Sequence, residues 1–383
     1  ADNLIVQDPN QVMENKVEPG KSGKWLPNAS PPVFLVISLS IVTFATVLLA
    51  LSLIYTQEQT HLDNFLQATD FQVCQHHGLS RALSPDAICT LIVAPKSLSV
   101  QSSNTASADH TRFIFQSWKA LKNVEFVIVS DDCTTLRLAN IYGLATFIPS
   151  SGSAAEDFTY RYLFKLIDEI LPVQSSTVGF SNGDIIYDST LVDSVNHMVQ
   201  HARDQGWRNW MLSGRRTNFD LPRHCMTSDS PFNVRFSRMV KIALETGSLY
   251  DSVAQDFFIF NRGIDLKWEC IPPFLLGGVY FDNWFAGMIA HHPVIKAVDF
   301  SSVLHAYHVN HGHTRSLSHG SVSSTINRVI GYTGENYIAH GNLECMPWVA
   351  TKNWTNGIEI SSRNRDLEDS KVYDNFWACQ SKQ

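Results

Sequence analysis

Short apolar runs alternate with longer amphipathic segments from residue 87 to residue 213, and this alternation limits the fold more than any other feature. Such an alternation predicts a parallel, doubly wound α/β sheet with right-handed crossovers. Four of the expected strands lie at 87–93, 124–129, 145–148 and 209–213. A further strand is expected to begin at Thr177, before the last of these. The expected helices lie at 111–121, 134–142, 154–171 and 190–205. The second half of the chain is less regular, with a further helix expected at 282–290 and a strand at 298–307.

The strand that begins at Thr177 leads into the polar cluster Asn182-Gly183-Asp184. A strand that ends in this way places a carboxylate at the carboxyl edge of the sheet, where open α/β proteins bind ligands. Oxygen ligands at that edge suit Mg²⁺ or Mn²⁺ bound to phosphate oxygens. A plain Asn-Gly turn after a strand is the alternative interpretation of the same residues.

Polar side chains also follow two other expected strands. Asp131 and Asp132 follow the second strand, and Arg215 and Arg216 follow the fifth. Acids and paired arginines at one sheet edge suggest a metal with a phosphate-bearing ligand, because the Arg guanidinium presents a planar fork to phosphate oxygens. A surface network of ion pairs is the alternative.

Asp282 follows Gly277-Gly278 at the start of an expected helix. It can cap that helix, or it can act as a general base that takes a proton from an acceptor hydroxyl.

Four histidines lie between residues 305 and 313, and two of them, His308 and His311, follow or end an expected strand. Histidine is a common metal ligand, so these two are candidate partners of Asp184 on a metal ion. Surface histidines in a loop are the alternative.

Residues 33–55 carry no charged side chain and are numerous enough to cross the hydrocarbon core of a bilayer. Lysines precede this run, and none follows it closely, so the positive-inside rule predicts a cytoplasmic N-terminus and a C-terminal part across the membrane. The expected organisation is a cytoplasmic tail at 1–32, a signal anchor at 33–55, a stem at 56–85 and a lumenal domain at 86–383.

The composition agrees with a secretory-pathway protein. All seven cysteines follow the expected span, in an oxidising compartment where disulfides form, and their odd number leaves at least one unpaired within the chain. Asn353-Trp354-Thr355 is an expected glycosylation site, whereas the sequon at Asn28 lies on the cytoplasmic side and is expected to be unused. The net charge of −7 gives no basic surface for nucleic acid.

A series of short motifs in the expected lumenal domain resembles a family. These motifs are Ser117-Trp118, Val129-Ser130-Asp131-Asp132, Asn182-Gly183-Asp184-Ile185, Gly214-Arg215-Arg216, Asp256-Phe257-Phe258-Ile259-Phe260, Ile271-Pro272-Pro273-Phe274, Asp282-Asn283-Trp284 and His308-Val309-Asn310-His311. In this order they resemble an uncharacterised glycosyltransferase-like family of the nucleotide-diphospho-sugar transferase (GT-A) fold. The resemblance covers roughly residues 87–345.

This resemblance implies an α/β fold with a GT-A-like (Rossmann-like) doubly wound mixed sheet. The uncharged run at 33–55 independently predicts one N-terminal transmembrane helix before it. The resemblance also implies that Asn182 and Asp184 occupy the motif that holds a divalent cation on a nucleotide sugar, with Asp131 near the nucleotide and Asp282 as the catalytic carboxylate. The chain departs from the family at Asn182, where the family has an acid. It departs again at Gly278 and Phe281, which replace an Arg and a Trp.

The expected function is therefore that of a type II membrane glycosyltransferase in the Golgi or another secretory-pathway membrane, or at the cell surface. Its partners would be a nucleotide-sugar donor, a glycan or protein acceptor, and Mn²⁺ or Mg²⁺. The expected site consists of catalytic Asp282, of nucleotide-sugar-binding Asp131, Asp132, Asn182, Arg215 and Arg216, and of the metal ligands Asp184, His308 and His311. The alternative is a non-catalytic lumenal or cell-surface protein that binds sugar or has a structural role.

Overall fold

The computed structural model describes residues 77–98, 105–149, 158–227, 229–310, 322–332, 341–355 and 357–363. The expected tail, the expected span at 33–55 and most of the expected stem lie outside this part of the chain. Among the described residues, no helix is both long enough and apolar enough to cross a membrane.

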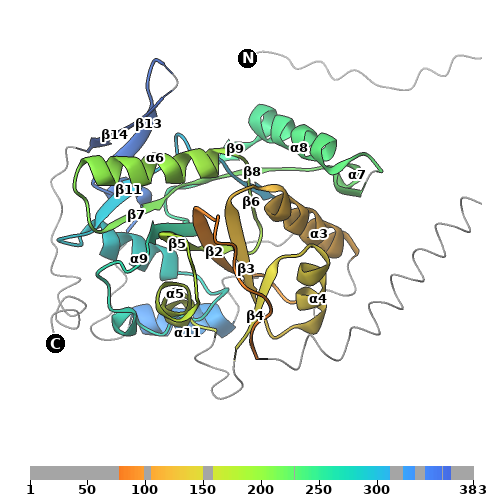
Figure 1. Cartoon of the computed structure of the whole chain (residues 1–383), viewed down its shortest axis with the longest axis horizontal. Helices are drawn as coiled ribbons and strands as arrows, with labels where there is room; N and C mark the ends of the chain where they lie inside the picture. The colour runs from red at the N-terminus through yellow and green to blue at the C-terminus, as the bar shows by residue number, and fades with distance from the viewer. Residues whose placement is uncertain are drawn as a thin grey trace, which may run out of the picture. The chain divides into compact units, whose positions relative to one another are not determined.

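Ten strands of the described residues form one mixed sheet. They are β1 (Gly78–Leu79), β2 (Cys89–Ala94), β3 (Val124–Val129), β4 (Ala145–Ile148), β5 (Thr177–Asn182), β7 (Trp210–Ser213), β10 (Phe257–Asn261), β11 (Lys296–Asp299), β13 (Trp348–Lys352) and β14 (Ile358–Ser362). Their order in the sheet is β1-β4-β3-β2-β5-β10-β7-β11-β13-β14 (Figure 1). The expected mixed α/β architecture with a Rossmann-like pattern of parallel strands is confirmed in β2 to β5.

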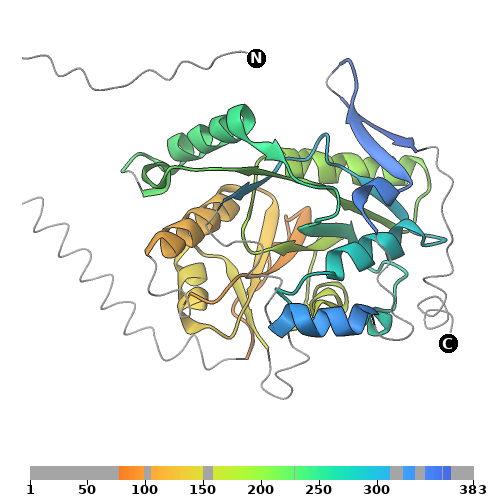
Figure 2. The same ribbon diagram turned by 180° about the vertical axis from the view of Figure 1, so that it is seen from behind.

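Helices cover both faces of this sheet. They are α3 (Thr105–Ala120), α4 (Cys133–Ile141), α5 (Tyr160–Lys165), α6 (Thr190–Asp204), α7 (Arg223–Thr227), α8 (Phe232–Thr246), α9 (Phe281–Ala290) and α11 (Val322–Tyr332), with the short turns η1 (Leu166–Ile170), η2 (Trp268–Cys270) and η3 (Leu343–Cys345). Figures 1 and 2 show α3, α6 and α8 on one side of the sheet and α5, α9 and α11 on the other.

The two faces of the sheet pack into two separate hydrophobic cores. Along β10, Phe257 and Ile259 belong to the core under α3 and α6, whereas Phe258 and Phe260 belong to the core under α5 and α9. Because both faces of such a strand are buried, its sequence is a continuous apolar run without alternation. This is why the strands are recognisable from the sequence as uninterrupted apolar segments.

The sheet is mixed, as the resemblance implies, and the parallel order expected from the alternation of strands and helices is interrupted at its centre. β10 lies between β5 and β7 and is antiparallel to both. Short-range patterns do not reveal this insertion, because β10 comes from the second half of the chain and its apolar run fits any buried strand.

The expected strand at 298–307 is two strands in two different sheets. β11 ends at Asp299, whose carboxylate accepts hydrogen bonds from the backbone and hydroxyl of Ser301 and so closes a turn. The chain then continues as β12 (Ala306–Val309). The expected helix at 154–171 is shorter where it is described, as α5 followed by the π-helical turn η1.

A small second sheet, which the sequence patterns did not predict, contains β6 (Ile185–Tyr187), β8 (Arg216–Phe219), β9 (Ser248–Leu249) and β12. Its order is β6-β12-β8-β9. In this sheet His308 is in register with Ile185 on one side and with Asn218 on the other. It therefore brings His308 and Arg216 next to the residues that follow β5.

Cysteine pairing is described for five of the seven cysteines. Cys133 and Cys270 each take part in a disulfide, whereas Cys89, Cys225 and Cys345 have free thiols. Cys74 and Cys379 lie outside the described residues.

Candidate functional site

The end of β5 and the start of β10 meet at the carboxyl edge of the sheet. Since β10 is antiparallel to β5, Asp256 comes to lie beside Asn182, and the Asn182 backbone N–H donates to the Asp256 carbonyl at 2.7 Å. The Asn182 side-chain Nδ2 also donates to Asp256 Oδ1 at 2.7 Å. The expected Asn-Gly turn does occur here, but it also carries a side chain that is fixed by a buried acid.

Arg216 completes this contact from the small sheet. Its Nη1 donates to Asp256 Oδ1 at 2.5 Å, its Nε donates to Asn218 Oδ1 at 2.8 Å, and its guanidinium lies 4.4 Å from the centre of the Tyr250 ring. The Arg216 guanidinium is therefore already paired within the protein. It has a structural role besides the phosphate-binding role expected for it.

Asp256 is a buried carboxylate that is incompletely satisfied. Its Oδ2 is buried and has no hydrogen-bond partner among the described residues. Burial raises the pKa of Asp256, and the nearby negative charge of Asp184 adds to that rise, while Arg216 opposes it. Buried polar atoms without partners are rare, so such an atom next to a second acid indicates a place where a bound group belongs.

Asp184 and His308 form a pair at this edge. His308 Nε2 lies 3.5 Å from Asp184 Oδ2, and the two side chains are 12% and 28% exposed, so both are within reach of a ligand from solvent. A carboxylate is a suitable ligand for Mn²⁺ or Mg²⁺, and the imidazole of histidine is a common metal ligand. Among the described residues, no group of three His, Cys, Asp or Glu side chains is arranged to hold a metal ion, and His311 lies outside them.

Two protein ligands nevertheless fit a cation that is held together with a phosphate ligand. Mg²⁺ is commonly bound by one or two carboxylates, with substrate phosphates and water completing its coordination. The side-chain oxygen of Asn182 is a further neutral donor in the same segment. Asp184 and His308 are therefore the described residues that could hold a divalent cation, with Asn182 two positions before Asp184 in the chain.

Asp282 lies in the first turn of α9. Asp282 is partly buried, and this loss of solvent around its carboxyl group, together with the negative charge of Asp256, raises its pKa to about 7, against the opposing backbone hydrogen bonds from Asn283 and Gln255. Asp282 is not the N-cap of the helix, because that position is held by Tyr280 in a left-handed conformation. The simple capping role is therefore not the one that the structure gives to Asp282.

Tyr160 lies against the same group of acids. Burial raises its pKa, and the negative charges of Asp282, Asp256 and Asp184 add to the rise. Its ring stacks on Phe281 with the centroids 3.7 Å apart. This contact explains why Phe281, which replaces a Trp of the resembled family, is a buried packing residue.

Helix α11 docks on the loop that leads to Asp282. The buried Asn327 side chain accepts from Leu275 N at 2.7 Å and donates to Leu275 O at 2.9 Å and Val279 O at 3.3 Å. Gly278 lies directly under this amide, and a Cβ there would lie 2.4 Å from Asn327 Nδ2 and 2.8 Å from the Ser323 carbonyl oxygen. The Arg of the resembled family has no room at this position.

We therefore predict that Gly278→Ala lowers the free energy of unfolding by roughly 1–3 kcal/mol, because the added methyl group forces α11 away from the loop. Chemical denaturation of the purified protein measures this loss. Adding Asn327→Ala should recover part of it, since the closest contact is with the Asn327 amide. A Gly278→Ala variant as stable as the wild type would show that α11 does not dock tightly on this loop.

Three predicted site residues do not join the cluster. Asp132 is buried and accepts from Thr135 N at 3.0 Å and Leu98 N at 2.9 Å, so it is the N-cap of α4 and holds the loop after β2. Arg215 donates to the backbone carbonyls of Leu249 and Tyr250. Asp131 is exposed at the end of β3.

Two residues of the cluster, Asp256 and Tyr160, were missed by reasoning from the sequence. A usable signal existed for Asp256, because it is an acid placed directly before a run of four apolar residues, 257–260. No signal existed for Tyr160, which is one aromatic residue among many in amphipathic segments.

Comparison with known proteins gives little further information. No family model matches the chain, and no curated protein matches it in sequence. One similar solved structure is a CMP:2-keto-3-deoxy-manno-octonic acid synthetase complexed with CTP. It is 12% identical, with a TM-score of 0.23, over 46% of this chain and 75% of that one. At this distance the similarity supports no argument about this chain.

Proposed function

We propose that the carboxyl edge of the sheet binds a nucleotide sugar together with a divalent cation, and that the protein transfers the sugar to an acceptor hydroxyl. The observation that carries the proposal is the pair Asp184–His308 in one cluster with the buried acid Asp256 and the partly buried acid Asp282, whose pKa is raised to about 7. Groups with strongly raised pKa values and a charge partner are typical of functional sites.

Asp184 and His308 would hold Mn²⁺ or Mg²⁺, with the Asn182 oxygen as a third donor; when bound, the cation would offset the negative charge of the diphosphate. Asp256 fixes Asn182 and Arg216 through its Oδ1, and so keeps both of them next to Asp184. The positive charge of Arg216 lies in the same cluster and favours an anionic ligand there.

Asp282 would act as the general base. A base is most effective when its pKa lies near the working pH, because it is then both largely ionised and strong enough to take a proton. With a pKa of about 7, Asp282 meets this condition, whereas an ordinary exposed Asp would be too weak a base. It would accept the proton of the acceptor hydroxyl as that oxygen bonds to the sugar and the bond to the departing nucleoside diphosphate breaks.

A second candidate function is the binding of a nucleotide sugar or sugar without transfer. The position of Gly278 favours it, because Asn327 and Ser323 fill the space that the Arg side chain of the resembled family would need. The neutral Asn182 in place of an acid favours it as well. A site that lacks both the Arg and the acid of the family pattern has fewer charges with which to stabilise a transition state, although it can still bind a ligand.

Incubation of the full-length protein with a panel of nucleotide sugars and Mn²⁺ distinguishes the two functions. If the protein transfers sugar, a nucleoside diphosphate is released only when an acceptor is present. Chromatography of the reaction mixture measures this release. Binding without release, for every donor and acceptor mixture tested, would contradict transfer and support the second function.

The proposed membrane anchor and lumenal orientation predict that Asn353 carries a glycan. Asn353 lies in the hairpin turn between β13 and β14, where its Oδ1 accepts from Thr355 Oγ1 at 2.7 Å, and the neighbouring Trp354 is 95% exposed. Treatment with a peptide N-glycosidase should increase the electrophoretic mobility of the expressed protein.

Asn353→Gln should abolish this shift, and the matched change Asn28→Gln should leave it intact. Digestion of the C-terminal part by protease added to sealed vesicles would contradict the lumenal orientation.

A further inference from the structure

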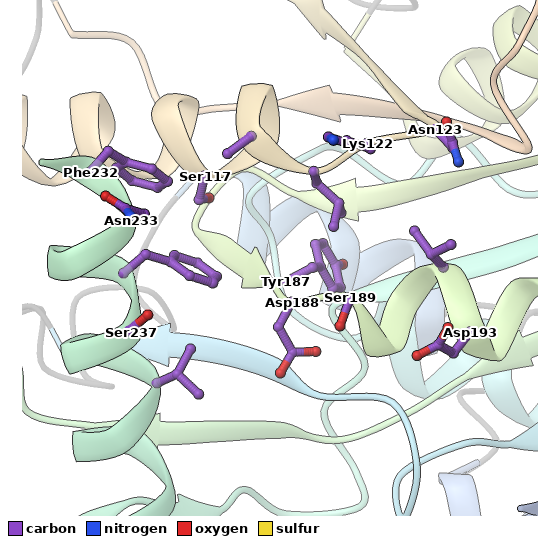
Figure 3. Close-up of a pocket in the computed structure, with 15 residues that line it drawn as sticks. Ser117, Lys122, Asn123, Tyr187, Asp188, Ser189, Asp193, Phe232, Asn233 and Ser237 are labelled. Carbon is purple, nitrogen blue, oxygen red and sulfur yellow. The ribbon is translucent and has the colours of Figure 1, made fainter.

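A cavity of about 660 Å³ lies between α3, α6 and α8, and none of its lining residues belongs to the Asp184 cluster (Figure 3). Asn123, which lines it, directly precedes β3, whereas the Asp184 cluster follows the carboxyl ends of the parallel strands. This part of the cavity therefore lies at the opposite edge of the sheet, while Tyr187, which also lines it, pairs through its Oη with Ser181 at 2.7 Å. Its volume falls within the usual range for binding sites of small molecules.

The floor of the cavity is aromatic and aliphatic. Phe232, Phe236 and Val240 are spaced by four residues along α8, so they share one face of the helix, and all three are half-buried. The rings of Phe232 and Phe236 have their centroids 5.6 Å apart. This face remains half-open because α3 and α6 border the cavity and do not cover it (Figure 3).

The rim of the cavity carries polar side chains from three chain segments: the loop between α3 and β3, helix α6 and helix α8. They are Lys122, Asn123, Asp193, Asn233 and Ser237. All five are exposed, and none of these side chains has a hydrogen bond or ion pair with another described residue. Amide, carboxylate and hydroxyl groups are thus available for a ligand above an apolar floor.

Asp188 has a different role at the centre of this view (Figure 3). Its Oδ1 accepts from Thr190 N at 2.9 Å, and its Oδ2 accepts from Tyr307 Oη at 2.8 Å and pairs with His305 Nδ1 at 3.0 Å. Its hydrogen-bonding capacity is largely used within the protein. It makes a rigid wall and adds negative charge, so that together with Asp193 it outweighs the single cation Lys122.

We infer that this cavity is a binding site for a neutral carbohydrate. A pyranose has a face of C–H groups that packs on aromatic rings and a rim of hydroxyls that pair with amides and carboxylates, which matches the floor and the rim. A purely apolar ligand would leave the rim groups unpaired. A phosphate or an acidic sugar would meet the excess of negative charge. This site does not depend on sugar transfer at the Asp184 cluster.

The inference is tested by binding of the full-length protein to an array of neutral and acidic oligosaccharides. The neutral oligosaccharide that binds most strongly is then titrated by calorimetry. Phe236→Ala and Asp193→Ala should each weaken this binding by at least about tenfold. The matched controls are Leu244→Ala, which is 64% exposed on α8, and Asp204→Ala on α6, neither of which lines the cavity. Both controls should bind like the wild type, as should Asp184→Ala.

Absence of glycan binding, or binding only of acidic glycans, would overturn the inference. It would also be overturned if the protein binds no glycan but binds an apolar dye, and the cavity variants weaken the binding of that dye. Loss of glycan binding in Asp184→Ala but not in Asp193→Ala would place the glycan at the other site and would overturn it too. Because Asp193 is exposed, its variant keeps the test valid if Phe236→Ala fails to fold.

Discussion

Asp282→Asn is expected to lower the rate of sugar transfer by roughly a hundredfold or more, the scale of a lost general base. Asn has nearly the same shape as Asp but cannot take a proton. Binding of the nucleoside diphosphate should be unchanged, since Asp184 and His308 remain in place. Transfer rates and calorimetric binding, measured on the same preparation, check both parts. Transfer close to the wild-type rate would show that Asp282 is not the base.

The same variant should change how stability depends on pH. The pKa of Asp282 is raised from 3.8 to about 7 in the folded protein. Between these two values the folded state binds more protons than the unfolded state, so the stability that Asp282 contributes at low pH is lost as pH rises through 7. Asn does not ionise, so the Asp282→Asn variant cannot lose this contribution. Its free energy of unfolding should therefore increase relative to that of the wild type as the pH rises from 5 to 8. If the free energy of unfolding depends on pH in the same way in Asp282→Asn and in the wild type, the raised pKa of Asp282 is contradicted.

Asp256→Ala is expected to lower the free energy of unfolding by roughly 3–5 kcal/mol, the second large effect. The carboxylate is buried, and its removal leaves the Arg216 guanidinium and the Asn182 amide without their shared acceptor. An uncompensated charge in a half-buried place is costly. Chemical denaturation measures the loss.

Glu245→Ala is the matched control, because Glu245 is 60% exposed and pairs with Lys241 along α8 at 3.8 Å. Exposed ion pairs of this kind contribute little, so the control should lose less than about 1 kcal/mol. If Asp256→Ala and Glu245→Ala lose the same amount, the buried contact with Arg216 does not hold this edge together.

The regular half of the fold was predictable because its signals are local. The strands β2, β3, β4 and β7 lie within one or two residues of the apolar runs expected for them, and α6 ends one residue before the end of the helix expected at 190–205. The position of β10 and the whole second sheet were not predictable, because both depend on pairing between segments far apart in the chain. Local patterns specify a strand but not its neighbours.

The candidate site was predictable only where a polar residue ends a strand. Asn182 and Asp184 were found in this way, and the second sheet then brings His308 to within 3.5 Å of Asp184. The two aspartates after β3 looked alike in the sequence, yet Asp132 is a buried helix cap and Asp131 is exposed. Only the three-dimensional surroundings separate such neighbours.

The central claim is that Asp184 helps to bind a divalent cation with a nucleoside diphosphate. The most direct test is the thermal unfolding of the full-length protein with a nucleoside diphosphate, with and without Mn²⁺. Ligand that binds the folded state alone raises the unfolding temperature. We predict a rise that requires both Mn²⁺ and nucleotide and that is absent in an Asp184→Ala variant that still unfolds cooperatively without ligand. An equal rise in Asp184→Ala and the wild type, or no rise in the wild type with any nucleoside diphosphate, would contradict the account.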